Sequence, residues 1–230
     1  MCGIIGFTGR KPAKDILIDG LERLEYRGYD SAGIALLNDD DTLTIRKKAG
    51  RVSELRELCK DGDYSSTCGI GHTRWATHGG VTDANAHPHR CGNVALIHNG
   101  IIENYSDIIR EYGLADKLVS ETDSEVVAAL LDTLYDGDPI AAIRKAVKII
   151  AGSFALCIMF ADRPGIIYAV RNVSPMVAAH SEEGSIIASD LTAIISFSKD
   201  YFVVPEYHIL TMTQEGIRVE DLKGNDEKPQ

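Results

Sequence analysis

The order of the predicted elements constrains the fold of this chain more than any other feature. Strand-like segments dominate the first hundred residues, helical patterns follow between residues 104 and 150, and strand-like segments return afterwards. Most of the connections between them are short. This arrangement is typical of antiparallel sheets with helices packed outside them, and it predicts one domain of the α+β class.

Periodicity and capping signals place the individual elements. Thr122-Asp123-Ser124-Glu125, for example, has the pattern of a capping box ahead of an apolar helix. The predicted helices are 12–25, 53–60, 104–112, 122–135 and 139–150. The predicted strands are 2–8, 32–37, 42–47, 68–72, 94–98, 153–160, 166–170, 175–179, 184–188, 201–204, 207–212 and 216–220. Residues 73–92 lack a clean period and are predicted to form a long loop, and long loops inside compact domains are often functional.

The charge of the chain argues against two classes of partner. The net charge is −10 at pH 7, whereas nucleic acids and anionic membranes bind clustered Lys and Arg. No apolar run approaches the roughly 20 residues that a membrane helix needs. The first residues also lack the basic and apolar segments of a signal peptide. We therefore expect a cytoplasmic protein that binds neither nucleic acid nor membrane, and a small polar substrate is compatible with this charge.

Neither the cysteines nor the histidines predict a metal site. The five cysteines are irregularly spaced and contain no CxxC pair, so a disulfide framework or a cysteine-only zinc site is not expected. His87-Pro88-His89 with Cys91 is the tightest cluster, but the ligand spacings of zinc hydrolases and deaminases are missing. The glycines match neither a dinucleotide fingerprint nor a phosphate loop. No metal and no cofactor are predicted.

Cys2 is a candidate nucleophile. Removal of Met1 would leave a thiol and a free α-amine on one residue. A terminal amine titrates near ~7.7–8.0, so part of it is neutral at cellular pH. It can then act as general base toward the thiol, directly or through one water. Taken alone, however, Cys2 is better explained as a small apolar residue that opens a strand.

Asn99-Gly100 is a candidate oxyanion hole. An Asn amide beside a Gly backbone N–H offers two donors to one point, where a tetrahedral intermediate places its negative charge. The same dipeptide between apolar runs is also the commonest signal of a hairpin turn. On this dipeptide alone the turn is the better interpretation.

The loop around Arg74 holds further candidates for substrate binding. Arg74 follows a buried strand, and such an Arg binds a carboxylate through two parallel hydrogen bonds. Thr77 adds a hydroxyl donor, and Trp75 is a candidate lid or anchor. A surface loop with one solvated Arg and one core Trp is an equally good interpretation.

Asp123, at the start of the predicted helix 122–135, has two interpretations. Its carboxylate either complements the helix dipole or binds an ammonium group of a substrate.

These signals occur together in an order that resembles the class II, or N-terminal nucleophile, glutamine amidotransferases. The sequences of these motifs are most similar to those of the glucosamine-6-phosphate synthase branch of that family. The resemblance covers essentially the whole chain and is densest from residue 2 to 126. The matching blocks are Met1–Gly6, Leu24–Gly33, Gly71–Gly79, Asn85–His89, His98–Asn104 and Ser120–Glu125.

The resemblance implies a four-layer αββα sandwich, in which two antiparallel sheets lie between helix layers. It also implies a role for each site residue. Cys2 is the nucleophile with its α-amine as base, Asn99 and Gly100 form the oxyanion hole, and Arg27 orders the surroundings of the nucleophile. Arg74 with Thr77 binds the α-carboxylate of glutamine, and Asp123 binds its α-ammonium. Trp75 is the gate to the ammonia path, and His78 and His87 lie in the substrate loop without a proton role.

The implied reaction is hydrolysis of L-glutamine to glutamate and ammonia through a Cys2 thioester. In the branch named above, ammonia passes to sugar-isomerase domains of the same chain, which bind fructose 6-phosphate. We therefore expect an amidotransferase domain over 1–222 and a polar tail or linker over 223–230, with the isolated domain monomeric and the full-length enzyme homo-oligomeric. Two alternatives stay open: a glutaminase domain of another class II amidotransferase, and a non-catalytic glutamine-binding module if Met1 is retained.

Overall fold

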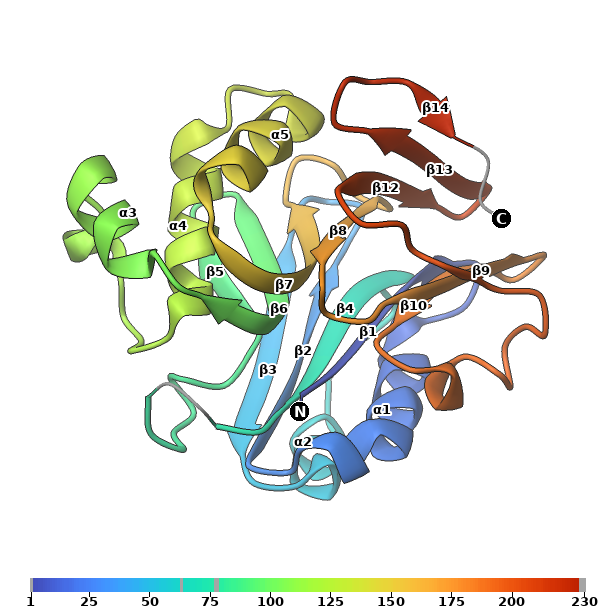
Figure 1. Cartoon of the computed structure of the whole chain (residues 1–230). Helices are drawn as coiled ribbons and strands as arrows, with labels where there is room; N and C mark the ends of the chain where they lie inside the picture. Colours follow the sequence, from blue (N-terminus) through green and yellow to red (C-terminus); the bar gives the residue numbers. More distant parts are fainter. Residues whose placement is uncertain (1, 63, 77–78, 228–230) are drawn as a thin grey trace.

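The computed structural model describes residues 2–62, 64–76 and 79–227. Two seven-stranded antiparallel sheets stack face to face (Figure 1). The first sheet has the order β11-β9-β10-β1-β4-β2-β3 and the second has the order β14-β13-β12-β8-β7-β6-β5. The strands of the first sheet are β1 (Gly3–Gly9), β2 (Ser31–Leu37), β3 (Leu43–Ala49), β4 (Cys68–Arg74), β9 (Val177–Ser181), β10 (Gly184–Ala188) and β11 (Phe202–Val203). Those of the second are β5 (His89–Cys91), β6 (Val94–Ile102), β7 (Gly152–Phe160), β8 (Ile167–Asn172), β12 (His208–Thr213), β13 (Gly216–Asp221) and β14 (Asp226–Glu227).

Helices cover the outer face of each sheet (Figure 1). The helices are α1 (Ala13–Leu24), α2 (Val52–Leu58), α3 (Tyr105–Tyr112), α4 (Asp123–Leu134) and α5 (Pro139–Ile149). One apolar cluster joins α1 and α2 to the first sheet, a second joins α3, α4 and α5 to the second sheet, and a third fills the space between the sheets. The predicted α+β class and the αββα layering are confirmed.

Strand alternation explains why polar residues gather at one end of the space between the sheets. Successive side chains of a strand point to opposite faces. Ile70 of β4 and Ile97 of β6 lie in the apolar cluster between the sheets. His72 and Asn99, two residues further along each strand, therefore face the same interior. The inward-facing surface changes there from apolar to polar, and Cys2 lies beside this end because it directly precedes β1.

The hairpin-turn interpretation of Asn99-Gly100 is wrong. The predicted strand 94–98 continues as β6 to Ile102, and Gly100 pairs with Phe154 of β7. Gly100 has φ +137°, and a Cβ atom at this position would lie 2.0 Å from the Ser153 carbonyl oxygen. Glycine is required here for a close approach inside a ladder, so Asn99 and Gly100 belong to a strand and not to a turn.

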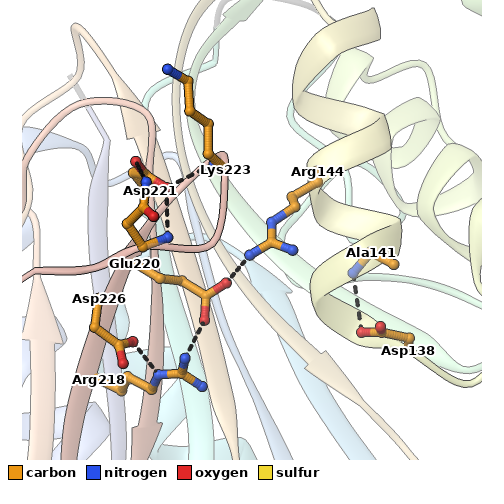
Figure 2. Close-up of polar contacts among 9 residues, drawn as sticks. Asp138, Ala141, Arg144, Arg218, Glu220, Asp221, Lys223 and Asp226 are labelled. Atoms are coloured by element: carbon orange, nitrogen blue, oxygen red, sulfur yellow. Dashed lines mark hydrogen bonds and ion pairs between the residues drawn. The ribbon is translucent and has the colours of Figure 1, made fainter.

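The last described residues form a strand, although their polar sequence predicted a tail or linker. Asp226 and Glu227 form β14, which pairs with Glu220 and Val219 of β13. Figure 2 shows the buried Glu220 carboxylate between Arg144 of α5 and Arg218 of β13, with Arg218 also bonded to Asp226. This network ties α5 to the edge of the second sheet.

Among the residues that the structure describes, we find no helix with the length and apolar composition of a membrane span.

The network predicts that Glu220 contributes much more to stability than its neighbour Asp226. The Glu220 side chain is 4% exposed, whereas that of Asp226 is 68% exposed. Glu220→Gln is expected to lower the free energy of unfolding by about 1–3 kcal/mol, because it weakens buried hydrogen bonds to charged groups. Asp226→Asn removes a solvated ion pair worth less than about 1 kcal/mol. Urea unfolding of both variants measures the difference, and equal losses would contradict this account.

Candidate functional site

Cys2 is partly buried, and its side chain and backbone carbonyl form hydrogen bonds with residues far from it in the sequence. Its sulfur accepts a hydrogen bond from the Trp75 N–H at 3.2 Å and lies 3.6 Å from the Trp75 carbonyl oxygen. Burial raises the pKa of the Cys2 thiol, while the Trp75 hydrogen bond and Arg74 oppose this rise. The thiol is therefore protonated at neutral pH, and attack on a substrate needs a base nearby.

The Cys2 backbone is held by two side chains that the sequence analysis predicted for the site. Its carbonyl oxygen accepts a hydrogen bond from Asn99 Nδ2 at 3.0 Å and one from Arg27 Nε at 3.3 Å. Arg27 ends a short 3₁₀ turn, Glu25–Arg27, that follows α1. Its guanidinium is anchored by Asp190, whose carboxylate lies 2.8 Å from Nη1. Asp190 was not predicted as a site residue.

Gly28 permits the close approach that brings these segments together. A Cβ atom at position 28 would lie 2.7 Å from both the carbonyl carbon of Arg74 and the backbone nitrogen of Trp75. Distances below 3.0 Å to backbone atoms leave no room for a side chain. The Tyr26–Asp30 segment can therefore pack directly against the end of β4.

Arg74 is mostly buried, and its guanidinium bonds the loop that follows β4. Nη1 donates to the Gly80 carbonyl at 3.0 Å, and Nη2 donates to the Gly79 carbonyl at 3.3 Å. The loop is held from its other side by Glu121, whose carboxylate accepts from the Gly80 N–H and from Asn85. Burial lowers the pKa of Arg74, and Cys2, Asp30 and Asp123 oppose this effect. Because an Arg stays charged in proteins, the site holds one fixed positive charge here.

Asp123 is the first residue of α4, and only 6% of its surface is exposed. Its Oδ2 accepts the Ile102 N–H at 2.8 Å, which ties the start of α4 to the end of β6. The predicted capping box is half correct. Thr122 Oγ1 accepts the Glu125 N–H at 3.2 Å, but the Glu125 carboxylate accepts from the N–H groups of Val119 and Ser120 rather than from Thr122.

One cavity brings together five of the predicted residues, while Arg27 and Asn99 bond the Cys2 backbone and are not among the lining residues. Cys2, Arg74, Trp75, Gly100 and Asp123 line it together, although they come from four separated parts of the chain. Trp75 is 46% exposed and packs edge-on against Tyr29, with the ring centroids 5.8 Å apart. The predicted residues Thr77 and His78 lie outside the described residues. The cavity is also lined by His87, His98, Thr122 and Ser124.

Four buried histidines, His72, His87, His89 and His98, lie close together, and two of them, His87 and His98, line this cavity. The rings of His72 and His87 stack with centroids 4.1 Å apart, and His89 lies edge-on to His87. His98 Nδ1 lies 2.9 Å from Ser124 Oγ. Burial lowers the pKa of His72 to about 3 and holds the pKa values of the other three below their usual range. All four rings are therefore neutral near pH 7, and within the described ranges no three metal-binding side chains are grouped to hold an ion.

Comparison with known proteins identifies the family. The family model described as a glutamine amidotransferase domain matches residues 72–196, which is more than half of the chain. The chain belongs to the glutamine amidotransferase family. The matched range includes Arg74, Asn99, Gly100 and Asp123, while Cys2 and Arg27 precede it.

The chain is similar to curated relatives from the branch that its sequence resembles. It is 45% identical over 227 residues to a glutamine–fructose-6-phosphate aminotransferase (isomerizing) of Fusobacterium nucleatum, covering 96% of this chain and 37% of that protein. It is 41% identical over 232 residues to the enzyme of the same name from Clostridium tetani, covering 99% of this chain and 38% of the relative. The chain thus spans less than two fifths of the length of these relatives.

A solved structure supports the amidotransferase fold independently. The glutamine phosphoribosylpyrophosphate amidotransferase of B. subtilis, solved with ADP and GMP, superposes with a TM-score of 0.84. The match covers 99% of this chain and 50% of that protein at 24% identity. At this identity the likeness concerns the fold alone.

Proposed function

We propose that this chain hydrolyses the side-chain amide of L-glutamine to glutamate and ammonia through a thioester on Cys2. One observation supports the proposal above all others. A thiol, a fixed positive charge and a buried carboxylate line one cavity through Cys2, Arg74 and Asp123. Glutamine carries a matching amide, α-carboxylate and α-ammonium, so each substrate group meets one complementary side chain.

In the proposed reaction, the α-amine of a processed Cys2 takes the thiol proton as the sulfur attacks the amide carbon. The carbonyl oxygen becomes an oxyanion, which the Asn99 Nδ2–H and the Gly100 N–H stabilise. The C–N bond breaks, and the protonated amine returns its proton to the leaving ammonia. Water then attacks the thioester, and glutamate leaves with the sulfur restored to a thiol. Arg27 holds the Cys2 backbone in place, and Trp75 acts as the gate between the glutamine site and the ammonia path.

We further propose that the ammonia serves amination of fructose 6-phosphate in additional domains of the full-length protein. The names of the relatives and the share of their length that the chain spans support this step. The amidotransferase domain would comprise residues 1–222, with a linker to the sugar-isomerase domains beginning at 223–230. Thr77 and His78 are proposed to complete the glutamine site.

Asp123→Asn tests the proposed recognition of glutamine. The change keeps the size of the side chain and an oxygen for the Ile102 N–H, but it removes the charge opposite the α-ammonium. A lost charge-assisted hydrogen bond is worth about 1.5–3 kcal/mol, so KM for glutamine is expected to rise about 10–100-fold. Because the interaction exists before and during the reaction, kcat is expected to change little. Steady-state assays of glutamate release measure both constants.

Asp107→Asn is the matched control. Asp107 also lies in the first turn of a helix, α3, but its side chain is exposed and its carboxylate is bonded to Arg110. Its replacement makes the same charge change outside the cavity and is expected to leave KM unchanged. Equal effects of the two substitutions, or no effect of Asp123→Asn, would contradict the assignment of Asp123 to the ammonium.

A further inference from the structure

We propose that His72 is a positioning residue, which holds the Asn99 side chain with its NH₂ group toward Cys2. This inference rests on the proposed function, because Asn99 matters as an oxyanion donor only if Cys2 attacks an amide. His72 lies on β4 of the first sheet and reaches across the interior to β6 of the second. Its ring is fully buried.

The contacts of one ring nitrogen determine its protonation. His72 Nε2 lies 3.0 Å from the His98 carbonyl oxygen and 3.0 Å from Asn99 Oδ1. A backbone carbonyl oxygen accepts hydrogen bonds and cannot donate them. Nε2 therefore carries the hydrogen, which is shared between the two oxygens. The other ring nitrogen, Nδ1, has no hydrogen-bond partner among the described residues.

This tautomer in turn determines how the Asn99 amide is oriented. An Asn side chain presents an acceptor on one side and two donors on the other. Only its oxygen can face the Nε2–H of His72, because the reverse orientation would oppose two donors. The NH₂ group must then point the other way, where Nδ2 donates to the Cys2 carbonyl at 3.0 Å. A buried histidine thus sets the direction of a donor at the nucleophile.

The neutral state of His72 makes this constraint independent of pH over the range in which enzymes are assayed. Burial lowers the pKa of His72 to about 3, against hydrogen bonds to His98 and Asn99 that raise it. A neutral imidazole has one N–H, and here its position is defined by the His98 carbonyl. Stacking of the His72 ring against His87 holds the ring plane.

Two substitutions separate positioning from packing. The side-chain amide of His72→Gln can replace the Nε2–H donor, whereas His72→Phe keeps an aromatic ring against His87 but has no donor. If His72 positions Asn99, kcat of His72→Phe falls about 10²-fold, the lower end of the loss expected for one oxyanion donor. KM for glutamine stays within about threefold, because no substrate contact is removed. His72→Gln is expected to retain at least ten times the kcat of His72→Phe.

A role in packing alone predicts the opposite order, because Phe preserves the buried ring and Gln does not. Equal kcat values, or a higher kcat for His72→Phe, would overturn the inference. Double substitution with Asn99→Ala gives a second check. The loss from His72→Phe is expected to vanish once the Asn99 amide is absent, and full additivity would count against coupling.

Nitrogen NMR of the unsubstituted protein tests the tautomer without relying on a variant that folds. The His72 ring is expected to show a protonated Nε2 and an unprotonated Nδ1 between pH 5 and pH 8. A protonated Nδ1, or titration of the ring near pH 6.5, would overturn the inference. Failure of the unsubstituted protein to turn over glutamine would instead refute the proposed function. If the unsubstituted protein turns over glutamine and the His72 variants have the same kcat, only the role of His72 would be refuted.

Discussion

The variant Cys2→Ala is expected to lose glutamine hydrolysis by a factor of about 10⁴ or more, because the group that forms the thioester is gone. Its fold is expected to stay unchanged. The Cys2 sulfur contacts only Trp75 in the observed hydrogen bonds, and the Asn99 and Arg27 bonds go to the Cys2 backbone, which Ala retains. Glutamate release and thermal unfolding of the same preparation measure the two properties.

Cys91→Ala is the matched control for this loss. Cys91 is also partly buried and lies on β5, but it does not line the cavity. Its removal is expected to leave turnover unchanged. Turnover that survives in Cys2→Ala would show that the sulfur is not the nucleophile, whatever the effect on substrate affinity.

A chain extended at its N-terminus is expected to be nearly inactive, even though every side chain of the cavity is present. Extension converts the α-amine of Cys2 into an amide, which has no basic lone pair. Burial already raises the pKa of the Cys2 thiol, so the thiol stays protonated without a base. General base catalysis typically contributes about 10²–10⁴-fold, and a loss of that size is predicted for kcat.

A protease site placed directly before Cys2 makes the extended protein its own control. Cleavage leaves Cys2 as the first residue and is expected to restore turnover, with intact mass confirming the new terminus. Equal activity before and after cleavage would exclude the α-amine as the base. Glutamine binding without turnover in both forms would favour a non-catalytic binding module.

Most of the fold follows from local patterns in the sequence. All five helices and twelve of the strands were predicted near their observed bounds, because apolar periodicity and capping residues act locally. The short strands β5 and β14 were missed. Apart from Cys91, their residues are polar, and they form strands because β6 and β13 offer an edge for pairing. No pattern within the segments themselves encodes that pairing.

The candidate site was predictable only as a set. Asn99-Gly100 resembles a turn until the partner strand β7 is known, and Cys2 alone resembles the start of a strand. Alternation along β6 predicts the direction of two side chains. Leu96 packs toward the helices, so His98, two residues later, faces α4, while Asn99 faces the space between the sheets. Asp190 and His72 escaped prediction as site residues because each acts through another side chain, Arg27 and Asn99 respectively.

The most direct test of the account is to trap the intermediate. The processed protein is mixed with isotope-labelled glutamine, quenched in acid and digested, and the N-terminal peptide is examined by mass spectrometry. We predict a labelled γ-glutamyl group on the sulfur of Cys2, absent from Cys2→Ala and lost on treatment with hydroxylamine. Turnover of glutamine with a γ-glutamyl group on another residue would contradict the central claim. So would turnover with no dependence on Cys2.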